Sequence, residues 1–275
     1  MQEPLAAVGD VRVRRHHARV DAALAAHLDR ARRGIAHPVE DFLFEYYSER
    51  PGRLRQFEPG LPNADVAVLR PRLDGIRWIR DLLAATDRRP PAFGCFGLHE
   101  WAMVHRSSRV RHRHLGLRLS DDEVAATVEE RGVRCTHFDA YRFFTPTALP
   151  HNDRVLTRAG QLTDDQPGCL HTTMDLYKWA GKLRPATPSE LIMDCFDLAM
   201  DVRWVDMRAS PYDLSSLPDP GGPIRTTSPI MIETTPGRAE YVALQREFAD
   251  RGQPLRRQLL EIAEQALAVL DLQVG

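Results

Sequence analysis

The chain has 275 residues, of which 43% are hydrophobic and 27% charged, and its formal net charge is -1. This composition excludes disordered and fibrous proteins and is typical of one large globular domain or two small ones. No run approaches the roughly 20 apolar residues of a membrane span, and the N-terminus lacks the layout of a secretory signal, so we expect a cytoplasmic protein without a membrane segment.

Basic and acidic residues are distributed unevenly along the chain. Residues 1–118 contain 21 Arg and 14 acidic residues, a formal charge of +7, whereas residues 119–275 contain 16 basic and 24 acidic residues, a charge of -8. The basic part can bind phosphate or an acidic partner, or the two parts can dock on each other and cancel their charges. Because the sequence contains no clear linker, we expect residues 1–275 to form a single domain.

Most of the chain has a helical pattern. Gly34 is a stop signal for the first predicted helix, and Thr187-Pro188-Ser189-Glu190 predicts a capping box that opens another. Near the C-terminus, Arg251-Gly252-Gln253 separates two predicted helices. Residues 37–40 carry a start signal for a helix that continues through 42–47 and ends before Pro51. Apolar residues at helical spacing predict helices over 16–33, 71–86, 187–208, 236–250 and 254–270.

The remaining segments predict short strands and loops. Residues 110–119 and 133–144 alternate polar and apolar side chains, which indicates strands, and residues 93–106 fit either a helix or a strand-turn-helix. Long connections over 145–168 and 210–235 are typical of functional lids or ordered wraps. The expected fold class is therefore mainly α: a single compact helical domain with a small β element and two long Pro-rich loops.

Three histidines, His99, His137 and His171, stand in apolar contexts close to carboxylates. On a strand, His137 and Asp139 would project from the same side, and His171 would complete a set of two histidines and one carboxylate. On a helix, His171 and Asp175 would share one face. The alternative for each pair is a buried histidine that is merely satisfied by an aspartate.

These residues predict a site that binds a divalent metal, with iron as the expected ion. The predicted ligands are His99, His137, Asp139 and His171. Whether the three histidines meet in space is not determined by the sequence.

Lysine usage points to the same region. The chain contains 35 Arg but only two Lys, Lys178 and Lys182, and both would share the helical face of His171. A lysine that burial deprotonates can act as a Schiff-base nucleophile, which arginine cannot do. The predicted catalytic residues are Glu100, Asp175 and Lys178, and the predicted substrate-binding residues are Trp101, Tyr141, Tyr177 and Trp179.

Two further patterns leave alternatives open. Asp194, Asp197 and Asp201 form a line on a helix that is apolar on two sides, so they either face solvent, pair with arginines or face a metal or cavity. The four cysteines form no Cys-x-x-Cys pair, which favours buried small side chains over a zinc site. Signatures of P-loop, dinucleotide-binding, serine-hydrolase and zincin proteins are absent from the sequence.

Five strings of the sequence resemble an actinobacterial family commonly labelled 3-methyladenine DNA glycosylase, and the resemblance covers most of the chain from His37 to Leu255. It implies duplex DNA as a partner of the basic part, Asp175 as the carboxylate that stabilises the departing sugar, and Trp101, Tyr177 or Trp179 as the ring that stacks an extruded base. The strings are HPVEDFLF (37–44), CFGLHEWAMV (95–104), HFDAYRFFTP (137–146), MDLYKW (174–179) and DMRASPYD (206–213).

The residues themselves favour a metal-dependent enzyme with a His/carboxylate site that acts on a small or medium organic substrate. The most specific version of this prediction is a non-haem iron oxygenase-like reaction, in which Lys178 or Tyr141 orients an anionic group of the substrate. The alternatives are a DNA glycosylase that removes alkylated bases and a non-enzymatic binding protein for an acidic partner. The sequence leaves the substrate, the metal and the oligomeric state open.

Overall fold

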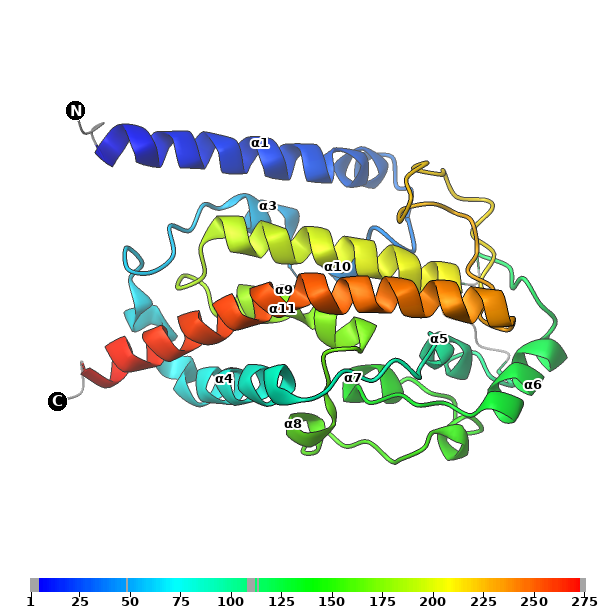
Figure 1. Cartoon of the computed structure of the whole chain (residues 1–275). Coiled ribbons are helices and arrows are strands. Elements are labelled where there is room, and N and C mark those ends of the chain that lie inside the picture. The colour runs from blue at the N-terminus through cyan, green and yellow to red at the C-terminus, as the bar shows by residue number, and fades with distance from the viewer. Residues whose placement is uncertain (1–4, 48, 108–111, 113, 273–275) are drawn as a thin grey trace.

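The structure is a computed structural model of the chain, and it describes residues 5–47, 49–107, 112 and 114–272. Within these residues the protein is mainly helical, as predicted (Figure 1). β structure among them is limited to two isolated bridges, Leu117 with Tyr212 and Val133 with Asn152.

The helices follow one another with few long interruptions. In chain order they are α1 (Leu5–Arg32), α2 (Phe42–Tyr46), α3 (Pro51–Arg55), the 3-10 helix η1 (Val66–Arg72), α4 (Leu73–Arg88), α5 (Leu98–Ala102), α6 (Asp121–Arg131), α7 (Phe138–Tyr141), the 3-10 helix η2 (Leu149–His151), α8 (Gln161–Asp164), α9 (Leu170–Lys182), α10 (Ser189–Ala209) and α11 (Thr235–Leu272). Among the described residues, no helix is both long enough and apolar enough to cross a membrane.

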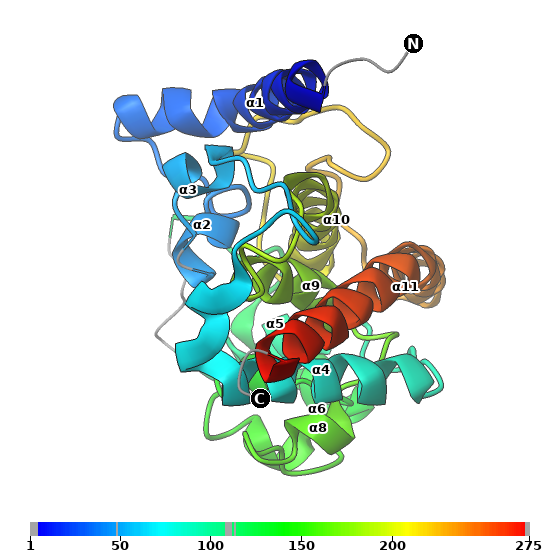
Figure 2. The same ribbon diagram turned by 90° about the vertical axis from the view of Figure 1, so that its left-hand side faces the viewer.

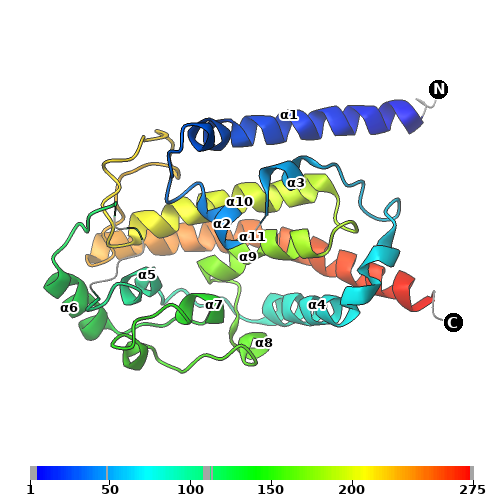
Figure 3. The same cartoon turned by 180° about the vertical axis from the view of Figure 1, so that it is seen from behind.

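Helices α9, α10 and α11 pack against one another in the middle of the molecule. Helix α1 lies along one side, over α10 and α3, whereas α4 lies on the opposite side against α11 (Figures 2 and 3). The short helices α5, α7 and α8 lie on the same side as α4 (Figure 1). The core therefore surrounds α9 and α10, which are buried over most of their length.

The acidic line on α10 is paired with arginines, one of the alternatives that the sequence left open. Arg19 of α1 contacts Asp194 at 2.8 Å and Asp197 at 2.6 Å. Asp201 contacts Arg251 of α11 at 2.6 Å. A basic residue of the N-terminal part thus docks on the acidic C-terminal part, which allows the opposite charges to cancel locally.

The capping box predicted at residues 187–190 is wrong. Helix α10 begins at Ser189, and its N-cap residue, Pro188, makes no side-chain cap. The Ser189 hydroxyl instead accepts a hydrogen bond from the backbone N–H of Glu58, and Glu190 pairs with Arg12. The predicted cap residue, Thr187, is buried and its Oγ1 has no hydrogen-bond partner, while a contact with the distant Arg12 has taken the Glu190 carboxylate. A true capping box opens α6, between Ser120 and Glu123.

The two helices predicted at the C-terminus form a single helix, α11, with Pro254 in its interior. Gly252 lies within the helix and does not break it. Because glycine has no side chain, α11 can approach α9 closely there: a Cβ atom at residue 252 would lie 3.0 Å from Thr173 Cγ2. Phe248 and Leu259 are buried on either side of the proline. Their packing offsets the cost of about 3 kcal/mol that a proline imposes inside a helix.

This continuity predicts that Pro254→Ala raises the free energy of unfolding by about 1–3 kcal/mol, because alanine restores a backbone N–H donor in mid-helix. Urea denaturation measures the change. Pro236→Ala is the matched control and should give no such gain, since Pro236 lies in the first turn, where N–H groups have no partner within the helix. A helix broken at residue 254 would leave the Pro254→Ala variant no more stable than the wild type.

The strand predicted over 133–144 is also wrong. Residue His137 has an extended backbone, but it is the N-cap of helix α7, and Asp139 lies in the first turn of that helix, where a negative charge is favourable. Part of the other predicted strand lies outside the described residues. Of the ambiguous segment 93–106, only Leu98–Ala102 is α-helical, following Gly97 in the left-handed conformation. The connection 210–235 contains no helix before α11, as expected.

Helix α1 is held to the body partly by His16. Its Nε2 lies 3.0 Å from the carbonyl oxygen of Leu54 in α3, and the ring is buried. Burial lowers the pKa of His16 below its ordinary value of 6.5.

Because the unfolded chain protonates this histidine first, its contribution to stability is present above pH 6.5 and is lost as the pH falls through the lower folded-state pKa. We expect the free energy of unfolding to fall less between pH 7.5 and pH 5.5 in His16→Asn than in the wild type. Urea titrations at both pH values, with His17→Asn as the control, measure this. Equal losses in the wild type and His16→Asn would contradict the prediction.

Candidate functional site

The three candidate histidines lie in one buried row. The His171 ring stands in the middle, with its centroid 4.4 Å from that of His99 and 5.6 Å from that of His137. None of the three is more than 7% exposed. Helix α5 supplies His99, the residue before α7 is His137, and α9 supplies His171, so three separate elements build the row.

One end of the row is a set that we call the α10 group: His99, Glu100, His171 and Asp206. Each member offers a ligand atom within 4.8 Å of the others, a geometry that is able to hold a metal ion. His99 Nε2 lies 2.7 Å from Asp206 Oδ1. The buried Arg203 donates to both carboxylates, at 2.8 Å to Glu100 and 2.9 Å to Asp206.

The charges within the α10 group are strongly coupled. Burial by itself would raise the pKa of Asp206, but His99, His171 and Arg203 hold it well below its usual range. Burial opposes protonation of His99, yet the Asp206 carboxylate raises its pKa well above 6.5. Burial and the neighbouring His99 lower the pKa of His171. The group therefore contains an imidazolium–carboxylate pair beside a neutral imidazole.

A thiol extends this line. Cys95 Sγ lies 3.3 Å from His99 Nδ1, on the opposite side of the ring from Asp206. Cys95 is partly exposed, whereas the other three cysteines are buried, and all four are free. A cysteine, a histidine and an aspartate in this order are the parts of an activated nucleophile.

The other end of the row is a set that we call the α7–α9 group: His137, Asp139 and Asp175. Their ligand atoms also lie within 4.8 Å of one another, and all three residues are buried. His137 Nδ1 lies 3.1 Å from Asp165 Oδ1, and its Nε2 lies 3.7 Å from Asp175 Oδ2. Asp165 is held in turn by Gln161, which donates at 3.1 Å.

Two buried atoms of the α7–α9 group have no hydrogen-bond partner: His137 Nε2, and Asp139 Oδ1, which has the Arg142 guanidinium 3.5 Å away. Buried polar atoms are normally hydrogen-bonded, so atoms left open in the midst of other ligand-type atoms indicate a binding position. Burial opposes the charged form of His137, but Asp165 raises its pKa.

Lys178 bridges the two carboxylates of this group. Its Nζ lies 2.9 Å from Asp139 Oδ2 and 3.0 Å from Asp175 Oδ2, and Tyr47 donates a further hydrogen bond to Asp175 at 2.9 Å. Burial opposes the ammonium form, but the two aspartates outweigh it and raise the pKa of Lys178. This pairing favours a charged, bridging Lys178 over the deprotonated form that a Schiff-base nucleophile requires.

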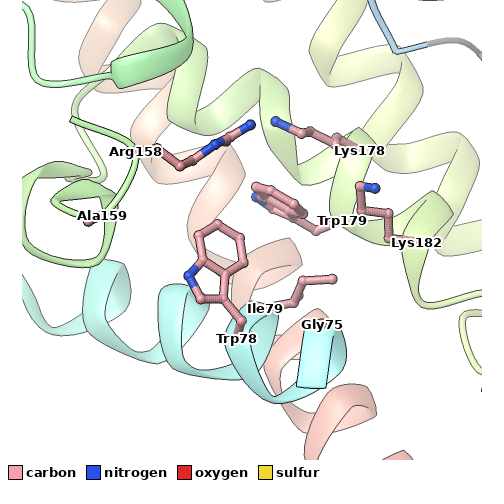
Figure 4. A pocket seen from close by; sticks show the side chains of 8 residues that line it. All are labelled: Gly75, Trp78, Ile79, Arg158, Ala159, Lys178, Trp179 and Lys182. Carbon is pink, nitrogen blue, oxygen red and sulfur yellow. The ribbon is translucent and has the colours of Figure 1, made fainter. Parts of the chain in front are cut away.

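The predicted substrate-binding residues occupy different surroundings. Trp101 is fully buried and donates to the carbonyl oxygen of Ala209 at 2.8 Å. Tyr177 is buried in the core, and so is Tyr141, the last residue of α7. Trp179 lines an open cavity of about 520 Å³ (Figure 4). Of these four aromatic residues, Trp179 alone belongs to the lining of that cavity.

The cavity lies between α4 and α9 and is connected to the α7–α9 group through Lys178, which belongs to both. Figure 4 shows the side chains of Arg158 and Lys178 pointing toward each other above the Trp179 ring. The lining residues are Gly75, Trp78, Ile79, Arg158, Ala159, Lys178, Trp179 and Lys182.

Sequence reasoning missed several residues of the site. Arg203 and Asp206 had a usable signal, because charged residues three positions apart interrupt an otherwise apolar face of α10. Asp165 and Trp78 had none, since their relation to the histidines exists only in three dimensions. A third set, His105, Glu129 and His151, was also missed.

This third set is less suited to a metal. Arg106 binds the same Glu129 oxygen as His105, at 2.7 Å and 3.0 Å, respectively. Arg106 and His105 lower the pKa of Glu129 to about 2. Glu129 is exposed, whereas all members of the α10 group and the α7–α9 group are buried.

Comparisons of the chain with models of protein families, with curated proteins and with solved structures gave no match. The geometry of the buried groups is therefore the only guide to what the site can hold.

The coupling in the α10 group predicts that Asp206→Asn lowers the free energy of unfolding by about 3 kcal/mol or more, because it leaves buried cations without their counter-charge. Chemical denaturation measures the loss. Asp194→Asn, on the same helix with a side chain 49% exposed, is the control and should cost at most about 1 kcal/mol. Equal effects of the two substitutions would contradict a buried ion pair.

Proposed function

We propose that the protein is a metal-dependent enzyme whose divalent cation binds at the α7–α9 group. One observation carries this proposal: His137 is held at Nδ1 by the buried Asp165, while its Nε2 stays unpartnered beside Asp139 and Asp175. Metal-binding histidines usually donate their other ring N–H to a carboxylate in this way, which fixes the ring and increases the basicity of the ligand nitrogen.

The ligand set determines the kind of chemistry. One imidazole and two carboxylates suit iron, manganese or zinc and leave coordination positions open for water, oxygen or substrate. A metal held there supplies a Lewis acid or an activated water, and an iron ion would support an oxygenase-like reaction. We favour a small or medium organic substrate, because the neighbouring cavity of about 520 Å³ has the size of a small-molecule site.

His171 would act beside this centre as a proton acceptor. It stacks on His137 with an angle of 7° between the rings, its Nδ1 has no partner, and its lowered pKa keeps it neutral. A neutral imidazole is the form that a general base requires. Glu100 and Asp206 lie at the opposite end of the row from the proposed metal. Both are bonded to Arg203, and their negative charges would balance the positive charges at that end.

The Lys178 ammonium would compete with a metal ion for the carboxylates of Asp139 and Asp175. It binds Oδ2 of Asp139 and Oδ2 of Asp175, so Asp139 Oδ1 accepts no hydrogen bond and has the Arg142 guanidinium 3.5 Å away, a cation that a metal would have to displace. The alternative to a metal centre is therefore a closed charge cluster in which the Lys178 ammonium neutralises both aspartates, with Arg142 and Arg158 at 3.5 Å and 3.4 Å from Asp139. Metal binding distinguishes the two arrangements.

We expect the protein, purified without a histidine tag, to bind about one equivalent of Fe²⁺, Mn²⁺ or Zn²⁺, with a loss of at least about tenfold in affinity in His137→Ala and Asp139→Asn. Elemental analysis after loading and competitive titration measure this. Asp165→Asn keeps all three ligands, and we expect it to weaken binding by about 10- to 100-fold through the orientation of His137.

His105→Ala is the matched control, because it removes a histidine of the third set and should leave binding unchanged. Folded wild-type protein that binds none of the three ions, or affinity that survives in His137→Ala, would contradict the metal centre.

A second candidate function rests on the line Cys95, His99 and Asp206, in which the thiol would be a nucleophile activated by an oriented histidine. It predicts that iodoacetamide alkylates Cys95 faster than the buried cysteines and that Asp206→Asn slows the reaction. Equal alkylation of the wild type and Asp206→Asn would remove this candidate.

The DNA glycosylase and the binding protein for an acidic partner remain predictions from the sequence. Asp175, the carboxylate that the glycosylase resemblance assigns to catalysis, is 1% exposed and bonded to Lys178. Duplex DNA binding with a steep dependence on salt, in protein free of metal, would favour the glycosylase.

A further inference from the structure

The cavity between α4 and α9 has two aromatic walls. Trp78 and Trp179 meet edge to face with their centroids 5.5 Å apart, and Trp78 is only partly buried although it is a large apolar residue. Ile79 adds an aliphatic surface. An indole wall that stays partly open to a cavity favours a flat ring as the ligand.

The polar part of the lining is entirely cationic. Its eight residues include Arg158, Lys178 and Lys182 but no carboxylate. Lys182 is exposed, and no ion pair of its side chain is found among the described residues. Arg158 holds its partners only loosely, at 3.4 Å to Asp139 and 3.2 Å to Gln161. Lys182 is therefore free to turn toward an anion, and the Arg158 side chain, although bonded to Asp139 and Gln161, is 61% exposed and accessible to one.

The use of lysine at this place is selective. The chain contains 35 Arg and two Lys, and both lysines line this one cavity. They lie four positions apart on α9, so their side chains extend from the same face of the helix. Lysine presents a compact charge on a flexible stem, which can follow an anionic ligand more freely than the planar guanidinium of arginine.

We propose that this cavity binds a small aromatic carboxylate, with the ring against Trp78 and Trp179 and the carboxylate between Lys182 and Arg158, and that such a compound is the substrate of the neighbouring centre. The assignment as substrate rests on the proposed function, whereas the binding itself does not. The connection is Lys178, which lines the cavity and contacts Asp139 and Asp175. A ligand in the cavity thus lies one side chain away from the candidate metal ligands.

Calorimetric titration of the full chain, treated with EDTA, tests the binding. The probes are naphthalene-2-carboxylate, its neutral analogue 2-naphthylmethanol, and inorganic phosphate. We expect the carboxylate to bind at least about tenfold more tightly than the neutral analogue, and phosphate alone to bind still more weakly because it lacks the ring. Equal binding of the carboxylate and the alcohol, tighter binding of phosphate, or no binding of the carboxylate overturns the proposal.

Three variants locate the site. Lys182→Met removes the charge but keeps the stem, and Trp78→Leu removes one wall; each should weaken carboxylate binding by about tenfold or more. Gly75→Leu adds a side chain where a Cβ meets no atom within 4 Å, so it should fill part of the cavity and weaken binding without disturbing the core. Arg80→Met, on the same helix but outside the lining, should bind like the wild type.

Circular dichroism of each variant establishes that it is folded before its binding is compared. Retained affinity in folded Lys182→Met and Trp78→Leu places the probe elsewhere and overturns the proposal.

Metal titration of the same proteins separates the two proposals. Trp78→Leu should keep the metal affinity of the wild type, and His137→Ala should keep the affinity for naphthalene-2-carboxylate. If the wild type binds the probe but no metal, the cavity site stands, and the proposed function falls together with the assignment of the ligand as substrate. If it binds metal but no probe, the cavity proposal falls and the metal centre stands.

Discussion

The interior of this protein depends on the neutralisation of buried carboxylates. Asp206 is fully buried, and so is almost all of Asp175. A buried charge without a partner costs several kcal/mol, so neither aspartate can remain in the core unless a cation is brought to it. For Asp206 the cations are His99 and Arg203, and for Asp175 it is Lys178. The contacts of His99 with Asp206 and of Glu100 with Arg203 join α5 to α10, and the contact of Lys178 with Asp139 joins α9 to α7, around the row of histidines.

The buried carboxylates at the two ends of the row are neutralised in different ways. In the α10 group, Arg203 bridges two carboxylates deep in the core, with a side chain only 1% exposed. In the α7–α9 group, Lys178 bridges two carboxylates with a side chain 16% exposed at the edge of the cavity. Both groups contain buried atoms without a hydrogen bond, such as His171 Nδ1 in the first and His137 Nε2 in the second, but the second is the one connected to the cavity, through Lys178. We therefore assign the proposed chemistry to the end that faces the cavity.

Arginine and lysine are used at different kinds of position in this protein. Arginine serves the fixed positions, such as Arg19 on the acidic line of α10 and Arg203 in the core. A planar guanidinium that binds two acceptors at once holds such a geometry well. The two lysines lie where a ligand is proposed to enter, and a flexible ammonium can change partners when an anion arrives. The metal centre and the cavity site thus share one side chain, Lys178, which contacts Asp139 and Asp175 and also lines the cavity.

The sequence by itself determined the helical fold, because the spacing of apolar residues is a local property that each helix carries within its own segment. It also indicated His99, His137 and His171 as candidates, since a histidine in an apolar context must find a polar partner. Their convergence, the pairing of Asp165 with His137 and the position of Trp78 at the cavity were decided only by the tertiary structure. The same holds for the continuity of α11 across Pro254 and for the missing cap of α10. In each case the outcome depends on side chains that are far apart in the chain and close together in space. Local sequence patterns contain no information about such contacts.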